Sequence, residues 1–180
     1  LALESASGDA ENHLHHADRA LGRMDRLVED LLVLARNGED VGERESVSLS
    51  DAVRTCWGTV ETGGADLRVE GDTVLRADES RLRQLLENLL RNAVEHGSTN
   101  GGAVTVTVGV LADGFYVEDD GPGIPEKERE RVFDHGYTTD DSGTGFGLAI
   151  VERIAEAHGW SVAATESAAG GARFEVTTGE

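Results

Sequence analysis

Apolar residues in the first part of the chain recur at alternating spacings of three and four. These positions are Leu14, Ala17, Leu21, Met24, Val28, Leu31 and Ala35. The period places them on one stripe of a helix over 13–36, and the charged residues of this segment fall off the stripe. A lone helix of this kind is marginal in water. The stripe therefore predicts packing against another helix, either of a second chain or of a segment that precedes residue 1.

The helical pattern stops at Asn37-Gly38, and the charged stretch that continues through Arg44 has the composition of a linker. We place a domain boundary near residue 40. The sequence thus predicts a helical region over 1–40 and a separate domain over 41–180.

The domain beyond this boundary alternates between helical and strand periods. Helices are expected over 49–62, 78–96 and about 146–158, and strands over 67–70, 73–77, 103–110, 114–118, 161–166 and 172–178. Ser48 and Asp78 can cap the first two helices, and Gly97 fits the C′ position after the second. Gly71-Asp72 marks a turn. Interleaved helices and antiparallel strands predict an α/β fold, a two-layer sandwich in which helices cover one face of a mixed sheet.

The charge balance excludes one class of partner. The chain has 35 acidic and 16 basic residues, which gives a formal net charge of −19. This charge repels a phosphate backbone, and no basic stripe offers a local exception, so nucleic acid is not an expected partner. No apolar run approaches the roughly 18 residues that span a bilayer, and no export signal is recognisable. We therefore expect a soluble, cytoplasmic domain without a membrane segment.

Lys127 is the single lysine beside this acidic excess, a composition that resembles proteins of salt-loving organisms such as haloarchaea. High salt screens the self-repulsion of such a surface. An ordinary acidic protein is the alternative interpretation.

Candidate chemistry begins on the 78–96 helix, where Asn88, Asn92 and Glu95 stand at positions i, i+4 and i+7 beside the leucine face. Amides at the edge of a buried helix need hydrogen-bond partners, and an amide oxygen is also a hard ligand suited to Mg²⁺. Two solvated asparagines are the alternative.

Two glycine-containing segments follow. Asp119-Asp120-Gly121-Pro122-Gly123-Ile124 comes after a strand, and its glycines allow close approach of a flat ring while a carboxylate accepts a hydrogen bond from an exocyclic amine. Gly143-Thr144-Gly145-Phe146-Gly147-Leu148 opens a helix, whose free amides can hold phosphate. A plain turn and an ordinary glycine loop are the alternatives, since each motif alone is weak.

Together, in this order, the segments resemble the histidine-kinase branch of the ATPase superfamily that also contains DNA gyrase, the Hsp90 chaperones and MutL. Asn88 through His96 resembles the N box, and Asp119 through Ile124 resembles the first glycine box. Phe133 and Tyr137 fall where an F box is expected, and Gly143 through Leu148 resembles the second glycine box. The resemblance covers roughly 41–180.

The resemblance implies that Asn92 ligates Mg²⁺, that Asp119 reads the adenine amino group of ATP, and that Gly143, Gly145 and Gly147 wrap the phosphates. It implies a mobile lid over 134–143. The nucleotide-binding residues implied are Asn88, Asn92, His96, Asp119, Gly121, Gly123, Ile124, Tyr137, Gly143, Thr144, Gly145, Phe146, Gly147 and Leu148. Glu95 departs from the pattern, because many family members carry a basic residue at this position.

The 13–36 helix resembles the second helix of the family's dimerisation and phosphoacceptor domain, so a homodimer through this helix is implied. His13, His15 and His16 do not match the phosphoacceptor box. The chain therefore resembles the catalytic portion of a protein histidine kinase that phosphorylates a histidine outside this chain, and a response regulator is the implied partner protein. Such a portion is not expected to label itself.

Two other functions stay open. An ATP hydrolase of the gyrase or chaperone type uses a Glu as general base where this chain has Asn88, and an amide cannot take a proton from water. Glu87 is the neighbouring candidate, although it lies about 100° around the helix. The second alternative is a nucleotide-gated module that dimerises and binds a partner without chemistry.

Overall fold

The computed structural model describes residues 24, 28, 42–97, 103–138 and 144–179. The chain forms two compact units, Leu1–Asn37 and Gly38–Glu180. In the first unit Met24 and Val28 are helical, and their side chains are 61% and 56% exposed. The other positions of the heptad stripe, and the three histidines at 13, 15 and 16, lie outside the described residues.

The second unit contains most of the described elements. Its helices are α2 (Leu49–Trp57), α3 (Glu79–Gly97) and α4 (Gly147–His158). Its strands are β1 (Glu45–Ser48), β2 (Asp66–Glu70), β3 (Val74–Ala77), β4 (Thr105–Leu111), β5 (Gly114–Asp119), β6 (Ser161–Glu166) and β7 (Ala172–Thr177). Two short 3-10 helices, η1 (Glu126–Glu128) and η2 (Arg131–Phe133), lie between β5 and α4.

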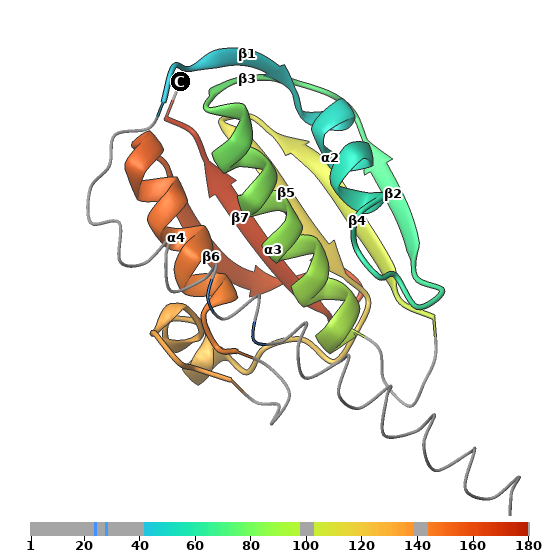
Figure 1. Cartoon of the computed structure of the whole chain (residues 1–180). Coiled ribbons are helices and arrows are strands. Elements are labelled where there is room, and N and C mark those ends of the chain that lie inside the picture. Colours follow the sequence, from blue (N-terminus) through green and yellow to red (C-terminus); the bar gives the residue numbers. More distant parts are fainter. Residues whose placement is uncertain (1–23, 25–27, 29–41, 98–102, 139–143, 180) are drawn as a thin grey trace, which may run out of the picture. The chain divides into compact units, whose positions relative to one another are not determined.

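The main sheet has the strand order β2-β4-β5-β7-β6. The β2–β4 pair is parallel and the other pairs are antiparallel, including the β4–β5 pair that the sequence predicts. Helices α2, α3 and α4 cover the same face of this sheet (Figure 1). The predicted two-layer α/β sandwich with a mixed sheet is confirmed.

A second, two-stranded sheet of β1 and β3 was not expected. The sequence predicts a Gly71-Asp72 turn between neighbouring strands, yet β2 pairs with β4 and β3 pairs with β1. Asp72 explains the difference, because its carboxylate accepts hydrogen bonds from Ser50 N at 2.9 Å and from Ser48 Oγ at 3.1 Å. The turn is thereby held against the start of α2 and directs β3 toward β1.

The helix caps agree with the sequence in two cases out of three. Ser48 Oγ accepts from Asp51 N, and Asp78 Oδ1 accepts from Ser80 N at 2.9 Å. Gly97 is not the left-handed residue after the helix, because it is the last residue of α3 and has no positive φ. A Cβ there would lie 2.6 Å from Val104 Cγ2, so close packing explains this glycine. Helix α2 also ends earlier than predicted, at Trp57.

The core fills the space between the helical layer and the sheet. From α3 it receives fully covered leucines: Leu82, Leu85, Leu86, Leu89 and Leu90. From the sheet it receives Val106, Phe115, Val117, Phe174 and Val176. Burial of each such side chain contributes on the order of 1.5–3 kcal/mol. In the part of the chain that the structure describes, none of the helices combines the length and apolar character that a membrane crossing requires.

Candidate nucleotide site

Asn88 lies in the interface between α3 and α4. Its side chain is 7% exposed, and its Nδ2 donates a hydrogen bond to Gln84 O at 2.9 Å. Its Oδ1 faces the first residue of α4, since a Cβ built on Gly147 would lie 3.3 Å from that oxygen. For Asn88 the alternative of a solvated asparagine is therefore wrong.

The stripe that begins at Asn88 opens toward solvent along α3. Asn92, one turn later, is half-buried, and Glu95 and His96 are exposed. A stripe that passes from a buried amide through a half-buried amide to exposed charged and polar side chains suits a ligand that is covered at one end and hydrated at the other.

Asp119, at the end of β5, is buried and 5% exposed. Its Oδ1 accepts hydrogen bonds from Gly121 N at 2.9 Å and from Ala172 N at 3.1 Å. Oδ2 accepts no hydrogen bond from the described part of the chain. Burial raises the pKa of this carboxyl, and the two backbone hydrogen bonds oppose the rise. Asp119 thus presents one fixed oxygen and one oxygen that is available to a hydrogen-bond donor.

The glycines around Asp119 are required by the packing of the backbone. A Cβ on Gly121 would lie 2.5 Å from Gly97 Cα, and a Cβ on Gly171 would overlap the carbonyl oxygen of Asp119. Gly123 has φ +71°, and a Cβ there would lie 2.6 Å from Gly170 O. The sequence predicts that Gly121 and Gly123 allow the approach of a ligand ring, whereas the structure shows that the fold itself already requires them.

Besides Ala172, two residues that support Asp119, Ser167 and Gly171, were not expected from the sequence. Ser167 Oγ donates to Asp119 O at 2.8 Å and accepts from Gly171 N at 2.9 Å. Both residues precede β7, far from Asp119 along the chain. The Gly170-Gly171 pair before a strand is the one local signal that could have indicated a close approach of backbone here.

The segment before α4 is held by backbone contacts. Gly136 N donates to Gly145 O at 3.0 Å, and Gly145 has φ +71°. Among the residues that the structure describes, none caps the start of α4 with its side chain, and Phe146 occupies the N-cap position. The first amides of a helix that lack a side-chain cap are suited to bind an anion. Thr144, Phe146 and Leu148 are half-buried, as is Ile124 after β5, and Gly143 lies outside the described residues.

Phe133 and Tyr137 have different surroundings. Phe133 is buried, and its ring packs edge-on against Phe174 with a centroid distance of 6.3 Å. Tyr137 Oη donates to Glu128 Oε2 at 2.9 Å, and the Arg131 guanidinium lies 5.7 Å from its ring. Tyr137 therefore ties the segment after η2 to η1.

Glu87 faces a different neighbour from Asn88. Its Oε1 accepts a hydrogen bond from Thr59 Oγ1 at 3.3 Å, just after α2. Asn88 faces α4 instead. The two side chains thus point to opposite neighbours of α3, which leaves Glu87 poorly placed to act at the start of α4.

This arrangement fits a nucleotide. Asp119 Oδ2 can accept from an amine, and the start of α4 offers amides to phosphate. Among the described residues no group of three or more His, Cys, Asp or Glu side chains could hold a metal ion.

Comparisons with known proteins agree with this geometry. The profile of the family described as "Histidine kinase-, DNA gyrase B-, and HSP90-like ATPase" matches residues 77–179. The sensor histidine kinase CpxA of Escherichia coli K12 is 32% identical over 97% of this chain and 41% of its own length. CusS of the same organism is 34% identical over 98% of this chain and 40% of its own length. The chain thus spans about two fifths of the length of these relatives.

Solved structures give the same result. The full-length ShkA structure in complex with AMPPNP aligns with a TM-score of 0.69 and 30% identity, over 85% of this chain and 35% of that chain. The mycobacterial sensor histidine kinase MprB aligns with a TM-score of 0.63 and 26% identity, over 74% of this chain and 95% of that chain.

Proposed function

Because the chain belongs to the family of histidine kinase-, DNA gyrase B- and HSP90-like ATPases, we propose that it is the ATP-binding catalytic portion of a two-component sensor histidine kinase. In this proposal the γ-phosphoryl group of ATP passes to a histidine outside the chain. The observation that supports it most strongly is the buried Asp119, whose Oδ1 is fixed by two backbone amides while Oδ2 stays available.

Asp119 Oδ2 is proposed to accept a hydrogen bond from the adenine amino group. The fixed geometry of the carboxylate makes this an orienting contact, because the hydrogen bonds from Gly121 and Ala172 prevent rotation. The ring would lie near Gly121, Gly123 and Ile124, and His96 would lie at the open end of α3.

The phosphates are proposed to lie between α3 and the start of α4. The first amides of α4, with Gly145 and Gly147, would donate to phosphate oxygens. Asn92 is the proposed ligand of Mg²⁺, and Asn88 would orient the phosphates from the buried side. When bound, Mg²⁺ neutralises charge on the phosphate oxygens, and phosphoryl transfer depends mainly on such positioning and neutralisation.

A lid over 134–143 is proposed to cover the nucleotide. Its first part is fixed by the Gly136–Gly145 hydrogen bond and by Tyr137, which bonds to Glu128. These contacts give a lid a fixed base from which the intervening residues could close.

Contacts of Glu87 disfavour the hydrolase alternative. Its carboxylate bonds to Thr59 and faces α2, so it cannot replace the missing base at position 88 without leaving that contact. A nucleotide-gated binding module would use the same contacts to the nucleotide. Only a measurement of phosphoryl transfer distinguishes it from the kinase.

We further propose that residues 13–36 form a homodimer stem, that a response regulator receives the phosphoryl group from the histidine, and that the domain works in the cytoplasm. Each of these rests on the family resemblance and on the heptad pattern of the first unit.

Transfer in trans tests the kinase proposal. The chain is incubated with ATP labelled at the γ-phosphate, with and without a fragment that carries the phosphoacceptor histidine proposed to lie outside this chain. We expect no label on the chain alone and label on the added fragment. Rapid phosphate release by the chain alone, lost in Glu87→Ala, would favour the hydrolase, and nucleotide binding without either reaction would favour the binding module.

A further inference from the structure

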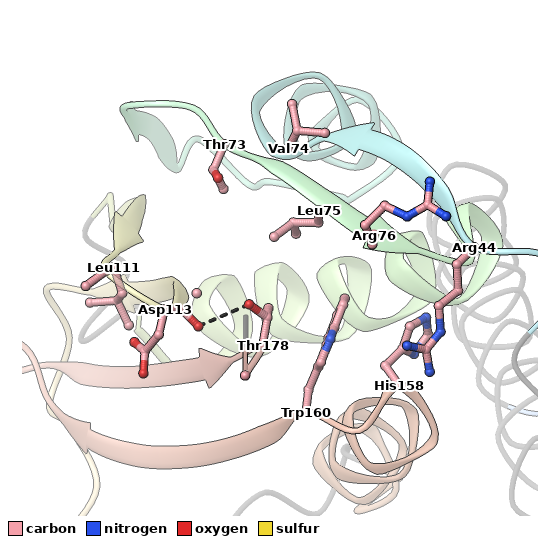
Figure 2. Close-up of a pocket in the computed structure, with 13 residues that line it drawn as sticks. Arg44, Thr73, Val74, Leu75, Arg76, Leu111, Asp113, His158, Trp160 and Thr178 are labelled. Atoms are coloured by element: carbon pink, nitrogen blue, oxygen red, sulfur yellow. Dashed lines mark hydrogen bonds between the residues drawn. The ribbon is translucent and has the colours of Figure 1, made fainter.

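A pocket lies at the C-terminal end of α4, whereas the proposed nucleotide site lies at the start of this helix. The pocket has a volume of about 350 Å³ and is bounded by β3, the β4–β5 turn, the residues after β7 and the end of α4 (Figure 2). Helix α4 has 12 residues, which separates its two ends by roughly 16 Å at 1.5 Å per residue. The pocket is thus distinct from the nucleotide site, and its volume is in the range of small-ligand pockets.

Two arginines line one end of this pocket. Arg76 stands on β3 opposite Ser46 of β1, and Arg44 directly precedes β1. Arg44 makes a long hydrogen bond of 3.5 Å to Ala157 O, and neither guanidinium forms an ion pair within the described ranges. Guanidinium groups match carboxylate and phosphate oxygens in a two-pronged geometry. This end of the pocket therefore favours an anionic group.

The other end offers polar groups of a different kind. Figure 2 shows Asp113 and Leu111 there, away from the arginines. The carbonyl oxygen of Asp113 accepts from Thr178 Oγ1 at 3.1 Å, whereas its carboxylate accepts no hydrogen bond from the described residues. The free carboxylate can accept hydrogen bonds from hydroxyl groups and would repel a second negative charge. A ligand with one anionic end and a hydroxylated body fits this distribution.

Internal contacts hold the wall beside the arginines. His158 Nε2 accepts from Asp78 N at 3.1 Å, so its Nδ1 carries the proton and donates to Ile154 O at 2.8 Å. The Trp160 ring lies 4.5 Å from the His158 ring and is largely buried. Because both nitrogens of His158 and the hydroxyl proton of Thr178 are used internally, the polar side chains that remain to recognise a ligand are the two arginines, Asp113 and Thr73.

We propose that this pocket binds a small hydroxylated organic anion, with its carboxylate or phosphate at Arg44 and Arg76 and its hydroxyl groups at Asp113. The shared chemistry is one anionic group on a polyhydroxy body. The two possible sources are sugar acids and sugar phosphates.

NMR titration of the ¹⁵N-labelled chain tests the proposal. Gluconate, glucose 6-phosphate and uncharged glucose are each added up to about 10 mM, which detects dissociation constants in the millimolar range. A non-hydrolysable ATP analogue with Mg²⁺ is present throughout, so that binding at the nucleotide site does not contribute. We expect saturable shifts of the Trp160 indole and of the Gly114 and Gly179 amides with at least one anion, and none with glucose.

Two variants with the same change of charge supply the control. Arg76→Gln should weaken binding of the anion by about tenfold or more, the effect of removing a hydrogen bond between charged groups. Arg68→Gln, on the exposed side of β2, should leave the affinity unchanged. The anion that binds identifies the source as carboxylate or phosphate. The proposal is overturned if neither anion gives saturable shifts, if glucose gives the same shifts, or if Arg68→Gln weakens binding as much as Arg76→Gln.

Discussion

The side-chain oxygen Oδ1 of Asn88 on α3 lies against Gly147, the first residue of α4, at a separation that leaves no room for a methyl group without movement. A Cβ at position 147 would be 3.3 Å from this oxygen. The amide and the start of the helix thus meet where the phosphates of the nucleotide are proposed to bind.

Gly147→Ala tests this contact. The methyl group should displace the Asn88 amide by a few tenths of an ångström while the fold stays intact, because alanine is a better helix residue than glycine. We expect nucleotide affinity to fall by about three- to tenfold, the effect of weakening one hydrogen bond between the start of α4 and a phosphate oxygen. Calorimetry measures the affinity, and Gly58→Ala, where a Cβ makes an ordinary 3.4 Å contact, is the control. Equal affinity in Gly147→Ala and wild type would contradict the assignment.

Asp119 should titrate above an ordinary aspartate. Burial raises its pKa, whereas the pKa of Asp72 is lowered, chiefly by hydrogen bonds from backbone amides. Carboxyl ¹³C shifts measured during an acid titration should therefore change at higher pH for Asp119 than for Asp72. The reverse order would show that Asp119 is not buried as described.

The raised pKa of Asp119 also makes the folding stability depend on pH. The pKa of Asp119 is higher in the folded state than in the unfolded state, so its protonated carboxyl contributes fully to folding stability below the unfolded-state pKa. This contribution is lost as pH rises through the folded-state pKa. Asp119→Asn should then be at least as stable as wild type at neutral pH, and this relative advantage should shrink in acid. Thermal unfolding at both pH values measures the difference.

The first unit is proposed to dimerise through its heptad stripe. Replacing Leu21 and Val28 by Asp should give monomers by light scattering, because a charge in a helical seam is strongly unfavourable. Nucleotide binding by the second unit should not change. A wild-type chain that is already monomeric would show that this helix alone does not form the stem.

Salt should stabilise the protein more than it stabilises a typical domain. The net charge of −19 repels itself, and screening grows strongly between about 0.1 and 2 M salt. A melting temperature that rises across a KCl series would support adaptation to high salt. One that is flat or falls would favour the ordinary acidic protein.

Much of the fold could be predicted from local pattern. The leucine period of α3 and the alternating valines of β4 follow from which face each residue buries, and both were expected within a few residues. The pairing of β3 with β1 could not be predicted, because it depends on Asp72 contacting Ser48 and Ser50 across the fold.

The candidate site, like the fold, could be predicted only in part from the sequence. The sequence identified Asp119 and Asn88 through motifs, but beyond the Gly170-Gly171 pair it did not indicate the contact across 48 residues in which Ser167 Oγ donates to Asp119 O and accepts from Gly171 N. The sequence also left Glu87 as a candidate general base, because its angular position on the helix does not determine which other elements its side chain contacts. These features depend on contacts between distant segments.

Calorimetric titration with a non-hydrolysable ATP analogue shows whether Asp119 and the start of α4 form a nucleotide site. The wild-type chain should bind one equivalent, more weakly without Mg²⁺. Asp119→Asn should weaken binding by about tenfold or more, because its amide would present a donor to the adenine amino group in place of a charged acceptor. Asp120→Asn, an exposed neighbour whose Oδ1 accepts from Thr105 N at 2.8 Å, should bind as wild type does. Absence of binding by the wild-type chain, or equal affinity in Asp119→Asn, would show that Asp119 does not form part of a nucleotide site.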